Sequence, residues 1–235
     1  MRSLSDQTGA ELGGAISVLT RQKSDHVKLN GLLAELDATP PEAQDGVLRR
    51  IYRLVFPHAF AEESVLWPVI RRVLPEGEEL TLRIEQEHQE VNELVTALEQ
   101  RAVDDPERSE ILARLVQVLR EDVRDEEDEL LPRLQAALTV GQLRVLGVAW
   151  ELVRRTAPTR AHPVVARRPP GNVAAAVPLS MLDRLRDLVD YAYQNQRTPR
   201  RSTLKAASEK LTSLAHRVEE LSIMKKGEDP TTHRG

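Results

Sequence analysis

The 235-residue chain is acidic overall, with a formal net charge of −4, and only 3 % of its residues are aromatic. Such a composition favours helices packed through aliphatic side chains, since β-sheets prefer β-branched and aromatic residues. The absence of cysteine excludes disulfides, iron–sulfur clusters, zinc–thiolate sites and cysteine nucleophiles. With no apolar run of about 18 residues and no signal-peptide core, we expect a soluble cytoplasmic protein without a membrane span.

Charge is divided unevenly along the chain. Residues 1–156 carry 19 Lys and Arg against 29 Asp and Glu, whereas residues 157–235 carry 14 against 8. The opposite signs predict different roles for the two parts. We expect an all-α protein with a four-helix bundle and a capping helix at 1–156, a proline-rich arm at 157–178, and a helical extension at 179–235.

The first predicted helix runs from about Glu11 to Leu36 and has an apolar stripe that includes Leu19 and Leu33. In steps of seven residues, His26 falls between these two leucines. We therefore expect the His26 side chain to face the core. The helix is expected to end at the Thr39-Pro40-Pro41 turn.

The second predicted helix runs from about Pro41 to Leu74, and His58 and Glu62 fill a gap in its apolar stripe. Because these residues are four apart, they lie one turn apart on the same face of a helix and can bind one metal ion together. Pro57 and Pro68 each remove a backbone donor, so we expect a kink or a loosened turn beside this pair.

The third and fourth predicted helices bring further inward polar residues. The third carries His88 on its apolar face, with Asn92 one turn beyond. The fourth begins after the Asp104-Asp105-Pro106 turn, and its stripe places Asp122 and Glu126 at inward positions. All four helices of one bundle therefore contribute an inward histidine or carboxylate.

Three more helices are predicted after the bundle. The helix at Val140–Arg154 is amphipathic and is expected to cap the bundle, and Arg197 to Arg201 forms a basic turn. A short helix at Leu179–Tyr193 is expected to begin through Ser180, with Asp183 completing a capping box.

The last helix, Ser202–Met224, has apolar residues at alternating steps of three and four: Leu204, Ala207, Leu211, Leu214, Val218 and Leu221. This seam is typical of a coiled coil, so it predicts a homodimer through residues 202–224 or packing on the chain's own bundle.

Buried ionised groups are costly unless they are paired or coordinated, so the inward histidines and carboxylates indicate a metal site. Bundles that hold two metal ions use such side chains on facing helices. Nitrogen and carboxylate ligands without thiolate favour iron, with manganese or zinc next. The acids near the site fall mostly off the stripes and are expected to face solvent: Glu63, Asp125, Glu127, Asp128 and Glu129. The remaining histidines, His162, His216 and His233, are not expected to be ligands.

The order of these residues resembles the hemerythrin-like family, whose members carry an HHE cation-binding domain. The likeness covers about residues 18–138 and lies in the motifs DHVKL, HAFAEESVLWP, EHQEV and EEDELLPRL. The segment TAPTRAHP, with PPGN after it, is similar to a tail of bacterial members. The resemblance implies an up-down four-helix bundle with a non-haem di-iron centre. Its ligands would be His26, His58, Glu62, His88 and Glu126, with the two glutamates as bridges.

Two positions depart from the family pattern. Asp122 stands where the family usually has a histidine, and Asn92 stands where oxygen carriers have a second histidine on the third helix. We expect Asp122 to serve as a sixth ligand. An anionic oxygen in place of a neutral nitrogen stabilises ferric iron, so the site is expected to be redox-active and not a reversible oxygen carrier.

The favoured hypothesis is an oxidoreductase that acts on hydrogen peroxide, dioxygen or nitric oxide, as a peroxidase, catalase or oxidase does. One alternative is a metal- or gas-binding sensor or store without turnover, with the basic C-terminal part reporting to a partner. Another is a degenerate bundle that holds one metal or none. Nucleic acid is the least favoured partner, because the chain is acidic and few aromatic residues accompany the basic patch at Arg197, Arg200, Arg201 and Lys205.

Overall fold

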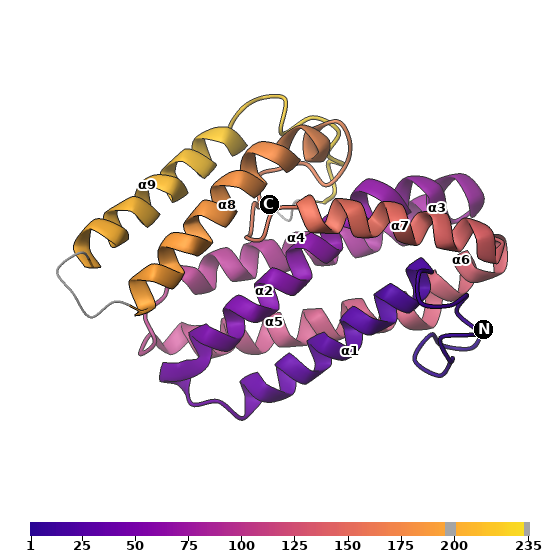
Figure 1. The fold of residues 1–235 in the computed structure, drawn as a ribbon, viewed down its shortest axis with the longest axis horizontal. Helices are drawn as coiled ribbons and strands as arrows, with labels where there is room; N and C mark the ends of the chain where they lie inside the picture. The colour runs from indigo at the N-terminus through magenta and orange to yellow at the C-terminus, as the bar shows by residue number, and fades with distance from the viewer. Residues whose placement is uncertain (196–200, 233–235) are drawn as a thin grey trace.

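The computed structural model describes residues 1–195 and 201–232, and these residues form helices and no strand. Four antiparallel arms make a bundle (Figure 1). The first arm is α1 (Val18–Asp37); the second is the short 3₁₀ helix η1 (Pro41–Ala43), α2 (Gln44–Ala61), the π-helix η2 (Glu62–Leu66) and α3 (Trp67–Val73); the third is α4 (Gly77–Glu99); the fourth is α5 (Pro106–Asp125), the π-helix η3 (Glu126–Leu130) and α6 (Leu131–Ala137). The predicted all-α, up-down bundle with extra C-terminal helices is confirmed.

The buried core of the bundle is divided into two apolar clusters. One cluster takes a residue from each arm at Leu29, Phe56, Val91 and Val123, and the other does so at Leu19, Ala61, Ile84 and Leu130. Between these positions lie His26, His58, His88 and Glu126, one on each arm, and the other two predicted site residues, Glu62 and Asp122, stand directly beside Ala61 and Val123. The bundle therefore encloses a polar layer between two apolar layers.

Helix α1 begins at Val18, so the predicted start at Glu11 was wrong. Gly13 and Gly14 adopt φ of 96° and 92°, a left-handed conformation that ends any helix and that glycine adopts most readily. Before them the chain folds back over η3, where the amide of Leu4 donates to the carbonyl of Glu127 at 3.0 Å. The N-terminal segment thus covers one end of the bundle.

Helix α7 (Val140–Thr156) begins at a capping box in which the side chains of Thr139 and Gln142 bond to each other's backbone amides. It packs along α1 and α2 and beside η2, instead of closing the end of the bundle. The predicted helix is therefore correct, and its position gives the bundle a fifth wall next to the polar layer.

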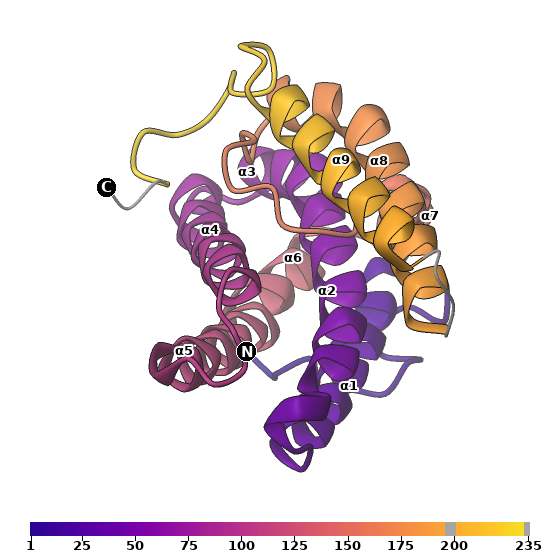
Figure 2. The same cartoon turned by 90° about the vertical axis from the view of Figure 1, so that its left-hand side faces the viewer.

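The C-terminal part crosses the bundle as irregular chain and then forms a hairpin of α8 (Gly171–Asn195) and α9 (Arg201–Glu219), which lie side by side (Figure 2). The predicted start of the first helix at Leu179 was wrong, because the alanine-rich stretch before Pro178 is already helical. Ser180 and Asp183 lie inside α8, so the predicted capping box does not form there. The predicted arm at 157–178 ends at residue 170, and the division into domains stays a prediction.

Helix α9 ends at Glu219, before the predicted end at Met224. Its apolar seam packs mainly on α8 of the same chain, and Leu214 and Leu221 remain 44 % and 51 % exposed. The seam predicted for a homodimer through residues 202–224 is thus largely used within the chain. Residues 197–200 of the predicted basic turn at 197–201 and His233 lie outside the described residues, and Arg201 is the first residue of α9.

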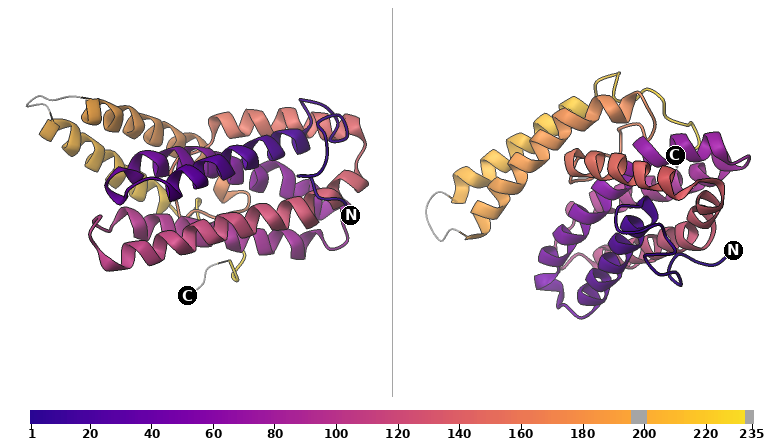
Figure 3. Two further views of the ribbon diagram at one scale, coloured as in Figure 1. Left: turned by 90° about the horizontal axis from the view of Figure 1, so that it is seen from below. Right: turned by 45° about the vertical axis from the view of Figure 1, so that its right-hand side comes forward.

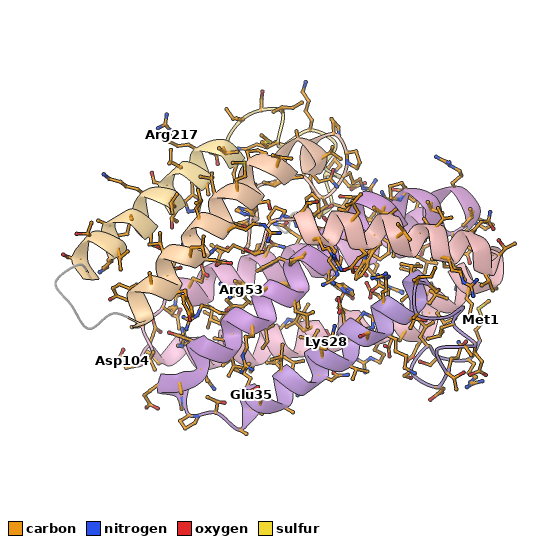
Figure 4. The ribbon with its side chains drawn as sticks, in the orientation of Figure 1. Met1, Lys28, Glu35, Arg53, Asp104 and Arg217 are labelled. Atoms are coloured by element: carbon orange, nitrogen blue, oxygen red, sulfur yellow. The ribbon has the colours of Figure 1, made fainter. Side chains whose placement is uncertain are left out.

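Ion pairs hold the hairpin against the bundle. Arg53 of α2, labelled in Figure 4, reaches Asp187 of α8 at 3.1 Å. His162, in the crossing segment, is buried between Asp183 of α8 and Glu219 of α9, at 3.1 and 2.8 Å. Beyond these contacts the far end of the hairpin projects away from the bundle (Figure 3, right).

Candidate metal centre

The second and fourth arms carry π-helical turns at corresponding positions. Each turn begins at a glutamate, Glu62 in η2 and Glu126 in η3. The backbone carbonyl of this glutamate accepts a hydrogen bond from the backbone amide five residues later. A proline, Pro68 or Pro132, stands six residues after each glutamate. Because proline has no N–H and its ring clashes with the carbonyl four residues earlier, a wider turn relieves the helix there. The predicted loosened turn is confirmed beside Pro68, whereas α2 continues through Pro57.

The side chain of Glu62 lies at the centre of the polar layer. Its Oε1 is 3.0 Å from Nε2 of His58, on its own arm, and its Oε2 is 3.6 Å from Nε2 of His88, on α4. Gln22 of α1 donates to Oε1 at 2.7 Å, which fixes the orientation of the carboxylate. The two oxygens of Glu62 therefore face two different histidines, as a bridging ligand requires.

The opposite wall of the layer is formed by the fourth arm. Oε2 of Glu126 is 3.1 Å from Nε2 of His26, and Oδ1 of Asp122 is 3.5 Å from Nε2 of His88. Two overlapping groups of potential ligands result, His26 with His58 and Glu126, and His88 with Glu62 and Glu126, and the donor atoms of each group lie within 4.8 Å of one another. The structure thus brings all six predicted site residues together, with Glu126 shared by both groups.

Each histidine turns Nε2 into the layer and its other ring nitrogen toward a supporting carboxylate. Nδ1 of His26 is 2.9 Å from Glu127, and Nδ1 of His88 is 2.9 Å from Glu63. Such carboxylates fix the tautomer and the orientation of a metal-binding imidazole. The prediction that Glu63 and Glu127 face solvent was wrong, since Glu63 is 1 % exposed and the Glu127 side chain 12 %.

His58 is supported from α1 and α7. Its Nδ1 faces Asp25 at 3.6 Å, and Arg154 of α7 approaches the same carboxylate at 3.4 Å. Trp150 of α7 meets the His58 ring edge to face at 5.3 Å between centroids, and the Arg154 guanidinium lies over the Trp150 ring. Helix α7 therefore forms the wall behind His58 and excludes water from it.

Several buried atoms in the layer make no hydrogen bond of suitable geometry among the described residues, although some of them lie close to one another. These atoms are Nε2 of His26, Oε2 of Glu62, Oδ1 of Asp122 and both carboxylate oxygens of Glu126. Buried polar atoms are almost always bonded, so a group of lone pairs that face one another indicates a site for a cation. Imidazole and carboxylate donors in this number suit divalent iron, manganese or zinc. The residues present therefore fit a metal centre.

The cluster also binds protons tightly. Burial lowers the pKa of His26, but the adjacent Glu126 and Glu127 outweigh it and raise the pKa to about 9. His58 likewise has a pKa raised to about 10, because Glu62 and Asp25 outweigh the effect of burial. Burial, with Glu62 and Asp122 nearby, raises the pKa of Glu126. A metal ion that binds here must displace protons, so its affinity rises with pH.

A cavity of about 30 Å³ opens on one side of the layer. It touches His26, His58, His88 and Asp122, and the rest of its lining is mainly apolar: Leu29, Leu54, Val55, Phe56, Ala59, Val91, Leu119 and Val123. This volume corresponds to about one water molecule. A cavity of this size favours a ligand of few heavy atoms.

The chain matches the Hemerythrin HHE cation binding domain over residues 17–134, which covers the polar layer and all four arms. It belongs to this family. This chain is 25 % identical over 134 residues to an uncharacterised hemerythrin-like protein of Schizosaccharomyces pombe (strain 972 / ATCC 24843). The match covers 57 % of this chain and 66 % of the relative. The chain is also 29 % identical over 121 residues to a DNA nickase of Nostoc sp. (strain PCC 7120 / SAG 25.82 / UTEX 2576), a match of 51 % of this chain and 34 % of that protein. No solved structure gives a significant match.

Asn92 connects the site of this hemerythrin-like protein to the C-terminal part. Its side-chain nitrogen Nδ2 donates to the backbone carbonyl of His88, and its Oδ1 accepts a hydrogen bond from the backbone amide of His162. The same crossing segment brings Arg167 to 3.9 Å from Glu63, which supports His88. The residue at the position of the carriers' second histidine therefore holds the crossing segment in place.

Sequence reasoning missed the supporting residues Asp25, Glu63 and Glu127, and the aromatic wall at Trp150. A signal for the carboxylates was present, since an acid stands next to His26, Glu62, His88 and Glu126 in each motif.

Among residues 1–195 and 201–232, no helix is long and apolar enough to cross a membrane.

Proposed function

We propose that this hemerythrin-like protein is a non-haem di-iron protein that reacts with a small oxidant, hydrogen peroxide, dioxygen or nitric oxide. The observation that carries the proposal is a cluster of three imidazoles and three carboxylates whose histidines, with Asp122, line a mostly apolar cavity of about 30 Å³. The donor set suits iron, and the cavity suits a molecule of two or three heavy atoms. A cytoplasmic location, as predicted from the sequence, is part of the proposal.

The proposed ligands divide into two positions. His26 and His58 would hold one iron, His88 and Asp122 the other, and Glu62 and Glu126 would bridge them. When bound, the two irons supply a Lewis acid and a source of electrons for the oxidant. The uneven division of nitrogen and oxygen ligands gives the two positions different electronic character.

The chain's own residues would control the reaction in three ways. Glu63 and Glu127 hold the ring protons at Nδ1 of His88 and His26, so that Nε2 stays available as a ligand. Trp150 and the apolar cavity lining keep bulk water away. Asp122 adds a third anionic ligand, which favours the ferric state and therefore net oxidation of the metal over reversible oxygen carriage.

The proposal is tested by loading the protein with ferrous iron without air and mixing it with hydrogen peroxide, air-saturated buffer or nitric oxide in a stopped-flow spectrometer. We expect about two irons per chain and catalytic consumption of at least one of the three molecules. A matched control is Asp128→Ala, an exposed position in the same π turn. Iron-loaded protein that consumes none of them would contradict the proposal.

A sensor without turnover is the second candidate, and the link from the site through Asn92 and Arg167 to the crossing segment favours it. In that case loading or oxidation of the metal would alter the C-terminal hairpin while no oxidant is consumed. Limited proteolysis of the apo, ferrous and ferric forms, with mass spectrometry of the cut sites, separates this candidate from the oxidoreductase.

The cyanobacterial relative is named a DNA nickase, and this chain matches 34 % of it. A pair of metal ions can also serve phosphodiester cleavage. Among the described residues, the site borders a cavity of about 30 Å³, which is too small for a DNA backbone. We therefore do not extend that activity to this chain, and a supercoiled-plasmid assay with magnesium, manganese or iron should show no nicking above a Glu126→Ala control.

A further inference from the structure

Helices α7 and α8 expose a series of large apolar side chains that no described part of the chain covers. They are Val145, Val148 and Leu152 on α7, and Val173, Val177, Met181, Leu185 and Leu188 on α8, and each is between 49 % and 70 % exposed. The two helices contact each other and lie on the side of the molecule that faces the reader in Figure 1. We call these eight residues the α7–α8 face.

The part of this face on α8 is a single stripe. From Val173 to Leu188 the residues follow one another at steps of four and three, which keeps them on one side of the helix over about 22 Å. Arg184 is the charged residue within this arc, and its guanidinium bonds to the carbonyl of Arg155 and the hydroxyl of Ser180. The stripe is therefore apolar along its length, with its one cation tied to the chain itself.

We infer that the α7–α8 face is the contact between two copies of this chain. Each exposed side chain leaves on the order of 100 Å² in water, so the eight together offer on the order of 800 Å². A stable interface takes about 800 Å² from each partner, whereas a monomer's largest apolar patch is usually about 300–600 Å². The area available thus matches what a dimer needs.

The order of residues on the stripe suits a two-fold axis. With Met181 at the axis and the two α8 helices antiparallel, Val177 of one copy lies opposite Leu185 of the other, and Val173 lies opposite Val189, next to Leu188. Every residue of the α8 stripe then meets an apolar residue. The stripe complements itself without any other partner.

Charge argues against a lipid surface as the occupant. Helices that lie on membranes carry Lys and Arg beside their apolar face. Here the carboxylates at the border of the stripe, Asp187 and Asp190, pair with Arg160, and Arg184 within the stripe bonds to the chain itself. Because these charges are already paired within the chain, the stripe offers apolar contact more than charge, and protein association is the better fit. This inference does not depend on the proposed di-iron function.

The absence of cysteine makes a direct test available. Met181→Cys introduces one thiol at the proposed axis, and mild oxidation of the full-length, metal-loaded protein should give a covalent dimer of twice 26.4 kDa on a non-reducing gel. Val27→Cys, a 61 % exposed position on α1, is the matched control and should stay monomeric. Equal cross-linking of both variants, or of neither, would overturn the inference.

Light scattering on a size-exclusion column supplies an independent measurement. The wild type should have twice the mass of the chain, and Leu188→Glu should halve it, with helical content by circular dichroism and iron content unchanged. A monomeric wild type at about 100 µM, or a dimer that survives Leu188→Glu, contradicts the inference. Binding of the monomeric wild type to neutral phosphatidylcholine vesicles would assign the face to lipid instead.

Discussion

The second and fourth arms of the bundle are built on the same plan and differ at one ligand position. Each has a glutamate at the start of a π turn, a following glutamate that supports a histidine on a neighbouring helix, and a proline further on. Four residues before Glu62 stands His58, and four residues before Glu126 stands Asp122. The comparison shows that the frame of the site can stay fixed while one donor atom, and with it the charge at one metal position, is changed.

The residues that face these two ligands respond in opposite ways. Asp25, which precedes His26, faces His58, and burial is outweighed by His58, Lys28 and Arg154, so the pKa of Asp25 lies well below its usual value. Glu87, which precedes His88, faces Asp122, and burial together with Asp122 and Asp125 raises its pKa to about 7. We call the proposed metal position with His26 and His58 one half of the site, and the position with His88 and Asp122 the other half. The acid that precedes the histidine therefore supports a ligand in the first half, where Asp25 faces His58, and repels one in the second, where Glu87 faces Asp122.

The largest effect is expected at the ligand that both halves share. Glu126→Ala removes the carboxylate common to both groups, so bound iron should fall from two per chain to nearly none, by elemental analysis after desalting. Asp128→Ala, in the same π turn but exposed, should keep both ions. Retention of one ion by Glu126→Ala would show that the two positions do not depend on a common bridge.

The two halves also differ in what covers them, since α7 lies behind His58 and the crossing segment lies beside His88. Burial lowers the pKa of His162 in that segment, but Asp183 and Glu219 outweigh it and raise the pKa to about 9. A raised pKa adds stability that is complete below pH 6.5 and disappears as the pH rises through about 9.

His162→Gln should therefore lower the free energy of unfolding by about 3 kcal/mol more at pH 6 than at pH 10. Urea titrations of the apo-protein at both pH values measure the difference. His216→Gln, at an exposed position of α9, is the control and should lower the free energy of unfolding much less than His162→Gln does. An equal loss at both pH values would mean that the His162 contacts are not ionic.

The supporting glutamates test whether the two halves are equivalent. Glu63→Gln and Glu127→Gln each weaken the acceptor of one imidazole proton, at His88 and His26, and each should reduce iron affinity by about 10- to 100-fold. Competition with a coloured chelator measures both constants. A large effect at Glu63 with none at Glu127 would show that one half alone determines binding.

Asp122→His makes the fourth arm match the second and should have the smallest effect on metal content, because a donor is kept. Glu87 would then accept the new imidazole proton instead of facing an anion. We expect two irons, slower oxidation by peroxide, and an absorption band that appears under air and vanishes under argon. Unchanged oxidation kinetics would mean that Asp122 does not control reactivity.

The six candidate ligands could be predicted because helical spacing of three and four residues places them on one face of each arm. Helical spacing alone missed Glu63 and Glu127, because a stripe drawn with a period of 3.6 residues assigns them to the surface, and the π turns change that period locally. The start of α8 was missed because the prolines at 169, 170 and 178 predicted an extended arm, whereas the helix begins at Gly171 and continues through Pro178. The position of Trp150 depends on tertiary packing, which spacing along one helix does not contain.

The number of irons per chain tests the central claim most directly, that the half with Asp122 still binds a metal. Elemental analysis of the wild type, reconstituted with excess ferrous iron without air and then desalted, should give two irons per chain. The same measurement on Asp122→Ala should give a clear loss from one position while the other stays filled. A wild type that retains one iron or none would contradict the account.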